Sequence, residues 1–277
     1  MHLNEIIQKQ KFIFHFNVST FEQLRAFCDI SKELNIWIIL GASEGERKFL
    51  GGDLLKKIVE FEKEKGAKVF LNADHCKSFK SAEEVLNFGY DAITLDFSNL
   101  NFDENKKLTK EFVEMARRIR KDVFIEGEVG NIKGKSEIFK EKIEIEEEDL
   151  TDPNLAEIFA KETNVDSLAI SVGNLHGIST STPIKIDFQR IKEIKRRTNK
   201  FLTLHGGSGI EYFQIKEAIE SGINIIHINT ELRYVWRNSL EKSLNDKIET
   251  ITPYLILNDV ILDLKIKTRE ILNFFYK

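Results

Sequence analysis

Eight short apolar runs alternate with helical patterns along the chain, and this alternation constrains the fold more than any other feature. Such runs are too apolar to be strands with one exposed face, so they are typical of parallel strands buried on both sides. The runs span residues 12–18, 36–40, 69–71, 92–95, 123–125, 167–172, 201–204 and 223–226. The repeat predicts an α/β fold, a (β/α)8 TIM barrel. A doubly wound open sheet is the alternative, but no glycine-rich dinucleotide turn follows an early run.

Length and composition are compatible with one barrel. A chain of 277 residues could form two domains by length alone, but about 250 residues make one barrel. The three prolines leave little sequence for a linker. We therefore expect a single domain over residues 1–277, with a C-terminal helical extension from about residue 253 to 277.

Charge and hydropathy argue against two classes of partner. Lys and Arg number 41 against 45 Asp and Glu, a net charge of −4, and no run of like charge is long enough to form a tail. We therefore expect no nucleic-acid partner. We also expect no membrane partner, because no apolar run approaches the roughly 20 residues that span a bilayer. The lack of a signal-peptide pattern and the two isolated cysteines, Cys28 and Cys76, predict a cytoplasmic protein with reduced thiols.

Polar side chains with catalytic or metal-binding chemistry stand where the expected strands end. In a (β/α)8 barrel the carboxyl ends of the strands meet at one face, which holds the active site. Four of the six histidines are in this group, which is harder to explain by packing than one strand-end histidine. The group consists of Asn17, Ser43, Asp74, His75, Asp96, Glu126, Glu128, His176, His205 and His227.

Three of these histidines predict a metal site. His75, His176 and His205 follow different strands, each beside a small residue or an acid. Three neutral imidazoles with an open fourth position are the ligand set of a catalytic zinc ion. Such an ion polarises a carbonyl and stabilises the enolate that forms beside it.

The strand-end acids have two expected uses. Asp96, Glu126 and Glu128 would orient the imidazoles or serve as alternative ligands. Asp74 cannot easily share a metal with the adjacent His75, so we expect it to move a proton on the substrate.

A glycine-rich turn predicts an anion site. The sequence His205-Gly-Gly-Ser-Gly209 follows the seventh expected strand and leads into a helix. Backbone N–H groups in such turns bind anions, and barrels commonly build their phosphate site after strands seven and eight. We therefore expect a phosphorylated carbonyl substrate. The one long irregular stretch, residues 129–151, predicts an active-site lid or a disordered segment.

Together these features resemble the class II, metal-dependent, fructose-bisphosphate and tagatose-bisphosphate aldolase family. The similar stretches run over nearly the whole chain and are highly specific as a set. They are Phe16-Asn-Val18, Ser43-Glu-Gly45, Asp74-His75, Leu95-Asp96, Glu126-Gly-Glu-Val-Gly130, Thr151-Asp-Pro153, His176-Gly177, Leu204-His-Gly-Gly-Ser-Gly209 and Asn229-Thr-Glu-Leu-Arg233.

The resemblance implies an aldehyde-lyase of carbohydrate metabolism, as in glycolysis. It would cleave a ketose (bis)phosphate reversibly into dihydroxyacetone phosphate and an aldehyde, through an enediolate bound to zinc. The implied ligands of the single zinc ion are His75, His176 and His205. Asp74 would act as the acid/base on the hydroxyl of the cleaved bond. Glu128 matches an acid at the metal's edge, and Asp96 matches one near a second cation position.

The resemblance also implies how the substrate is held. The phosphate of dihydroxyacetone phosphate, often with a monovalent cation, is bound in the family at positions that match Gly177, Gly206, Ser208 and Thr230. The full set of expected substrate- and phosphate-binding residues adds Asn17, Ser43, Gly207, His227 and Asn229. Family members are usually dimers or tetramers, so we expect a homodimer or a homotetramer.

Two departures from the family pattern fall where the substrate would bind. After strand eight, the family's Asn-Ile-Asp-Thr-Asp reads His227-Ile-Asn-Thr-Glu231, which adds bulk and removes a charge at Asn229. In the lid, the position of the family's catalytic glutamate holds Ser136. Glu137, one residue along, is therefore the candidate base for the enediolate step.

Three classes of function stay open. The first is a zinc-dependent aldolase acting on a ketose phosphate. The second is another zinc enzyme of the same family, such as an isomerase, an epimerase or a condensing enzyme; His227, Asn229 and Ser136 favour it because they would touch the substrate rather than the metal. The third is a non-catalytic sugar-phosphate-binding protein, which Asp74 disfavours because its only evident use is proton transfer.

Overall fold

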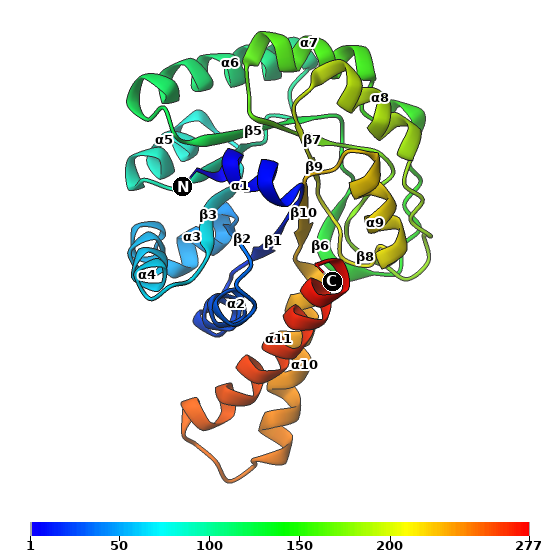
Figure 1. Ribbon diagram of the computed structural model, residues 1–277. Coiled ribbons are helices and arrows are strands. Elements are labelled where there is room, and N and C mark those ends of the chain that lie inside the picture. The colour runs from blue at the N-terminus through cyan, green and yellow to red at the C-terminus, as the bar shows by residue number, and fades with distance from the viewer. Residues whose placement is uncertain (1, 277) are drawn as a thin grey trace.

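The eight expected strands are present and close into one parallel barrel, seen in the computed structural model, which describes residues 2–276 (Figure 1). The barrel strands are β1 (Ile13–Asn17), β2 (Ile38–Ala42), β3 (Val69–Cys76), β4 (Ala92–Leu95), β5 (Phe124–Val129), β7 (Ser167–Ile170), β9 (Phe201–Leu204) and β10 (Ile225–Ile228). Their order around the barrel is β1, β10, β9, β7, β5, β4, β3, β2. The predicted single-domain TIM barrel is therefore confirmed, and the open-sheet alternative is excluded.

Helices follow the strands and cover the outside of the barrel (Figure 1). They are α2 (Phe21–Leu34), α3 (Glu44–Leu50), α4 (Gly52–Glu64), α5 (Phe79–Phe88), α6 (Phe102–Ile119), α7 (Pro153–Thr163), α8 (Phe188–Thr198), α9 (Tyr212–Ser221), α10 (Thr230–Asp246) and α11 (Pro253–Phe275). Side chains cap several of them; Asp152, for example, accepts the N–H groups of Asn154 and Leu155 before Pro153 continues α7. Within residues 2–276 no helix has the length and apolar character needed to cross a bilayer.

The inside of the barrel is apolar at one end and polar at the other. The apolar end is closed by a helix that the sequence pattern did not predict, α1 (Leu3–Gln10). The apolar cluster consists of Leu3, Ile6 and Ile7 from α1 with Ile13, Ile39, Phe70, Ala92, Phe124 and Ile225 from the first turns of the strands. Nearer the carboxyl ends lie the buried polar residues His15, Asn72, Thr94, Glu126, Ser167, Thr203 and His227. The functional face is therefore the carboxyl end, as in other barrels.

The segment between β5 and α7 is more ordered than the sequence predicted. Gly134–Phe139 form strand β6, and Glu147–Asp149 form a short 3-10 helix. β6 pairs in parallel with β8 (His176–Ser179) as a separate two-stranded sheet, with Gly134 opposite His176. The expectation of an irregular stretch was wrong because the pairing partner lies beyond α7 and β7, so no local pattern reveals it.

The last two helices form a hairpin that projects from the barrel (Figure 1). Ser243 Oγ on α10 donates to Asp259 Oδ2 on α11 at 2.8 Å, and Lys247 pairs with the same carboxylate at 2.6 Å. α11 then returns to contact α2. The helical pattern predicted from residue 253 is confirmed. Residue 277 lies outside the described residues, and the assignment of this segment as an extension of the one domain stays a prediction.

Candidate metal centre and active site

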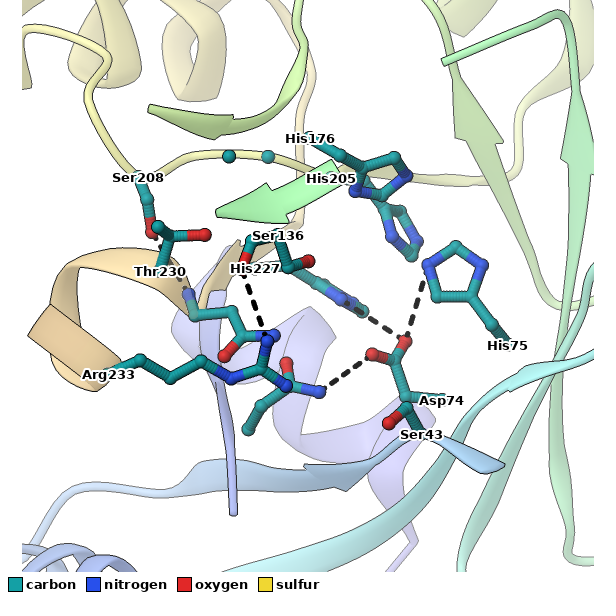
Figure 2. A pocket seen from close by; sticks show the side chains of 14 residues that line it. Ser43, Asp74, His75, Ser136, His176, His205, Ser208, His227, Thr230 and Arg233 are labelled. Carbon is teal, nitrogen blue, oxygen red and sulfur yellow. Dashed lines mark hydrogen bonds and ion pairs between the residues drawn. The ribbon is translucent and has the colours of Figure 1, made fainter. Parts of the chain in front are cut away.

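A pocket of about 240 Å³ lies at the carboxyl ends of the barrel strands (Figure 2). Its walls come from the loops after several barrel strands, from β6 and from the first turn of α10. The lining residues are Asn17, Ser43, Asp74, His75, Ser136, His176, Gly177, His205, Gly206, Ser208, His227, Asn229, Thr230 and Arg233. The structure thus brings together most of the residues predicted from the sequence. Asp96 and Glu128 line an adjoining pocket that shares His75 and His176.

Three imidazoles converge at one side of the pocket. His75 ends β3, His176 begins β8 and His205 follows β9. Their ring centroids lie 4.8 to 5.8 Å apart, and the rings are inclined to one another by 66 to 81°. One nitrogen from each ring lies within 4.8 Å of the others. This is the geometry of a three-histidine metal site, whose ligand atoms must face a common point.

A bulge in β3 allows two neighbouring residues to reach the pocket. Successive side chains on a regular strand point to opposite faces. Here the pairing of β3 with β4 shifts register between Ala73 and Cys76, and His75 adopts φ = 50°, in the left-handed region that few residues other than glycine occupy. Both Asp74 and His75 consequently line the pocket. Bulges beside active sites commonly re-aim side chains in this way.

Two carboxylates fix the orientation of the His75 and His205 rings. Asp96 Oδ2 lies 3.0 Å from Nδ1 of His75, and Glu126 Oε1 lies 3.0 Å from Nε2 of His205. Glu126 is itself fixed by the hydroxyls of Thr94 and Thr203. In His75 and in His205, one ring nitrogen is therefore bonded to a carboxylate and the other faces the cluster, as in histidines that bind metals.

The electrostatics of the cluster fit a cation. Burial lowers the pKa of His176 to about 3, which keeps this imidazole neutral and able to bind a metal. Burial opposes protonation of His75 too, but Asp74, Asp96 and Glu128 outweigh it and raise the pKa of His75 to about 10. The buried atoms Asp74 Oδ1 and Glu128 Oε2 have no hydrogen-bond donor among the described residues. Surplus negative charge and unpaired carboxylate oxygens around three imidazoles suit a divalent ion.

His227 lies between two other imidazoles. Its ring stacks on that of His15 at 3.5 Å between centroids and 6° between planes, and lies 3.9 Å from that of His205. Atoms of His15, Asp74 and His227 come within 4.8 Å of one another. The two stacked rings cannot share an ion, however, because an ion in the plane of one ring lies far out of the plane of the other. His227 therefore forms the floor of the pocket with His15 beneath it, and the stack is not a second metal site.

The stack is fixed by strand pairing and by a glycine. His15 and His227 are directly opposite each other in the β1–β10 pairing, so both side chains point into the barrel. A Cβ atom at Gly41, on the neighbouring strand β2, would lie 1.9 Å from the His15 ring. Only glycine at this position leaves room for His15. Burial lowers the pKa of His15 to about 4, so this ring is neutral.

The loop after β9 and the start of α10 build the anion-binding side of the pocket. Ser208 Oγ accepts the N–H groups of Asn229 at 3.0 Å and Glu231 at 3.2 Å, which holds the loop against the first turn of α10. Gly206 has φ = 65°, and a Cβ there would lie 1.9 Å from the carbonyl oxygen of Leu175. The N-terminus of α10, with Thr230 as its first residue, therefore faces the pocket with its positive helix-dipole end.

The lid strand presents Ser136, not Glu137, to the pocket. Ser136 lines the pocket, whereas the side chain of Glu137 is exposed. Alternation along β6 explains this, since neighbouring side chains face opposite ways. Glu137 is thus the one predicted catalytic residue that the structure does not bring to the site.

Sequence reasoning missed three residues of the site, each of which had a signal. His15 shares the inward face of β1 with Asn17, two residues on. Ser43-x-x-Glu46 is a capping-box pattern, and the structure shows both bonds, Ser43 N to Glu46 Oε2 at 2.7 Å and Glu46 N to Ser43 Oγ at 3.4 Å. This box starts α3 (Glu44–Leu50). Arg233 follows Asn229 by one helical turn and so faces the same way.

The fold and the site together define a (β/α)8-barrel protein with a candidate metal centre beside an anion-binding loop. Residues 2–276 match the model of the family described as fructose-bisphosphate aldolase class-II. The fructose-bisphosphate aldolase of Helicobacter pylori (strain J99) is 32% identical over 257 residues, covering 83% of this chain and 82% of that protein. The sulfofructosephosphate aldolase of Alkalicoccus urumqiensis is 29% identical, covering 83% of this chain and 79% of that protein. The crystal structure of the YdjI aldolase from Escherichia coli K12 matches with a TM-score of 0.81 and 27% identity, over 98% of this chain and 94% of that one.

The chain belongs to the class II fructose-bisphosphate aldolase family. It is therefore a class II aldolase, a lyase, and the resemblance seen in the sequence is confirmed. The family is zinc-dependent, with which the histidine cluster at the strand ends agrees. Membership also implies a phosphorylated sugar as substrate.

Proposed function

We propose that the protein cleaves and forms a ketose (bis)phosphate, with dihydroxyacetone phosphate as one product and an aldehyde as the other. We base this on one observation: the three imidazoles and Asp74 lie on one side of a pocket whose other side is the Gly206–Ser208 loop and the start of α10. A phosphate held at the loop would place the substrate carbonyl toward the histidines.

The histidines would hold zinc and Asp74 would move a proton. A zinc ion on His75, His176 and His205 would supply a Lewis acid that polarises the substrate carbonyl. Asn17 Nδ2 donates to Oδ2 of Asp74 at 2.9 Å, so Oδ1 remains to take the proton of the hydroxyl on the carbon that becomes the aldehyde. Burial disfavours the charged form, yet the neighbouring histidines hold the pKa of Asp74 well below its usual range. The carboxylate is therefore ionised, which a group that accepts this proton must be.

The remaining site residues would bind the substrate or tune the metal. Glu128 and Asp96 lie beside His75, at 3.6 and 3.0 Å, where we propose that they act at the edge of the metal site. We assign binding of the phosphate and of the substrate hydroxyls, with a monovalent cation near the phosphate, to Asn17, Ser43, Gly177, Gly206, Gly207, Ser208, His227, Asn229 and Thr230. We further propose that the protein acts as a homodimer or homotetramer in the cytoplasm.

A second candidate function is a reaction of the same zinc site on a different phosphorylated carbonyl compound, by another aldol reaction or an epimerisation. The floor of the pocket favours it, because the stacked His15–His227 pair fills space next to Asp74 with two rings that burial keeps neutral by lowering the pKa of each. Relatives of similar identity are named for different substrates, fructose bisphosphate and sulfofructose phosphate. Both substrates are therefore included in the test.

The test is release of triose phosphate from a panel of ketose mono- and bisphosphates and sulfofructose phosphate, with added zinc and with a chelator. We expect chelator-sensitive release from at least one ketose bisphosphate. Release from sulfofructose phosphate alone would support the same cleavage reaction on a different ketose phosphate. If zinc remains bound and no member of the panel is cleaved, the proposed reaction is wrong.

A lid variant tests the base of the enediolate step. We propose that Glu137 takes this proton, and β6 must move for it to do so, because its side chain is exposed. Glu137→Ala should therefore slow exchange of the C3 proton of dihydroxyacetone phosphate by about 10²- to 10⁴-fold, the usual contribution of a general base. Glu141→Ala, which removes an exposed glutamate two residues beyond β6, is the control. Unchanged exchange in Glu137→Ala would place the base elsewhere.

A further inference from the structure

Glu46 is a buried carboxylate at the centre of a hydrogen-bond network beside the pocket. Its side chain is 5% exposed, and both of its oxygens accept two bonds. Oε2 accepts from the backbone N of Ser43 at 2.7 Å and from Nδ2 of Asn17 at 3.2 Å. Oε1 accepts from Ser19 Oγ and from Nη2 of Arg233, each at 2.5 Å. The capping of α3 uses only Oε2, so the role of Oε1 is separate from helix capping.

One branch of the network leads to Asp74. The side-chain amide of Asn17 donates to Glu46 Oε2 and, at 2.9 Å, to Asp74 Oδ2. One NH₂ group thus bridges two buried carboxylates, which would repel each other without it. Because an amide is planar and has two N–H bonds at a fixed angle, a displacement of Glu46 turns Asn17 and moves the Asp74 carboxylate.

The other branch leads to the lid. Arg233 donates to Glu46 through Nη2 and to the carbonyl oxygen of Ser136 on β6 through Nη1, at 3.2 Å. Figure 2 shows the Arg233 side chain reaching Ser136, with a dashed line for this bond. The planar guanidinium fixes the angle between the two acceptors. β6 therefore cannot move away from the pocket without breaking the bond from Arg233 to Ser136. Contacts between α10 and β6 support the same position of the lid strand.

We propose that Glu46 is a positioning residue that couples the place of β6 to the orientation of Asp74, through Arg233 on one side and Asn17 on the other. The proposal rests on the proposed proton-transfer role of Asp74. With β6 over the pocket, Arg233 is held by two acceptors and Glu46 is fully bonded, so Asn17 keeps Asp74 Oδ2 engaged and Oδ1 directed to the substrate. With β6 displaced, Arg233 loses one acceptor and the network loosens. Proton transfer is thereby linked to closure of the site, which also excludes water.

Glu46→Gln tests this proposal because it keeps the size of the side chain and removes acceptor capacity at one terminal atom. We expect kcat for cleavage to fall about 10- to 100-fold, as for a misplaced catalytic group, with little change in KM or zinc content. In an Asp74→Asn background the same substitution should change the residual rate by no more than about 2-fold, because its effect passes through Asp74. An equal fall in both backgrounds would overturn the coupling to Asp74. Arg237→Lys and Glu241→Gln, an exposed ion pair further along α10, are the matched controls.

The lid half of the proposal has a readout that needs no turnover. Amide hydrogen exchange of residues 134–139 should be faster in Glu46→Gln and in Arg233→Lys than in the wild type, and unchanged in Arg237→Lys. Equal exchange in all variants would overturn the link to β6. If the wild-type protein cleaves no ketose phosphate, the proposed function is wrong. The hydrogen-exchange measurement decides separately whether Glu46 holds β6 in place.

Discussion

Replacing His205 with alanine is expected to remove bound zinc and to abolish cleavage. His205 is 1% exposed, and Glu126 holds its Nε2 at 3.0 Å, so its ring is fixed in the cluster. Loss of a residue that merely orients a ligand costs about 10- to 100-fold in metal affinity, and loss of the ligand itself should cost more. Zinc content after dialysis and the zinc dissociation constant measure this effect.

His205→Ala also removes one hydrogen-bond partner of the buried Glu126. A second ligand variant therefore separates loss of zinc from a general loss of structure. His176 is half-buried at the pocket wall, so His176→Ala should lose zinc while the protein keeps its circular dichroism spectrum and Tm near those of the wild type. His2→Ala, at an exposed position, is the matched control. Wild-type zinc content in both ligand variants would show that the metal is bound elsewhere.

Asp74→Asn is expected to keep zinc and to lose turnover. Asparagine preserves the shape of the side chain but cannot accept the proton of the substrate hydroxyl. A general base contributes about 10² to 10⁴ to the rate, so kcat for cleavage should fall by about that factor. Zinc content should match that of the wild type, because the three imidazoles remain. Steady-state cleavage rates and metal analysis of the same preparation measure both quantities.

The control for this variant is Asp259→Asn, in the hairpin that projects from the barrel, which should leave cleavage unchanged. Turnover within a few-fold of the wild type in Asp74→Asn would rule out its role in proton transfer. Loss of zinc would instead make Asp74 part of the metal site. The two outcomes are distinct because rate and metal content are measured separately.

The barrel and most of the pocket could be predicted because their signals are local. Each buried strand is one apolar run, and its polar end residue, such as Asp96 or His205, follows at once in the sequence. A barrel gathers these ends at one face, so the list of strand ends predicts the pocket. The fold class also places the turn at Gly206–Ser208 beside the start of α10, where the structure has it.

The parts that escaped prediction depend on contacts between distant segments. The pairing of β6 with β8 joins residues on either side of α7 and β7, so neither strand is recognisable alone. The stacking of His15 on His227 requires closure of the barrel between its first and last strands. Whether Ser136 or Glu137 faces the pocket depends on the register of β6, and a shift of one residue exchanges the two.

The close packing of Gly41, His15 and His227 sets an order in which the floor of the pocket can be altered. A larger residue at position 41 is excluded while His15 is present, because its Cβ would overlap the ring. Shrinking His227, which lines the pocket, enlarges the pocket and removes the stacking partner of His15, whereas shrinking the fully buried His15 opens a cavity inside the barrel, which lowers stability. Position 41 can therefore accept a side chain only after His15 has been replaced by a smaller residue. Any redesign that adds a side chain at position 41 starts with His15, a residue that does not line the pocket.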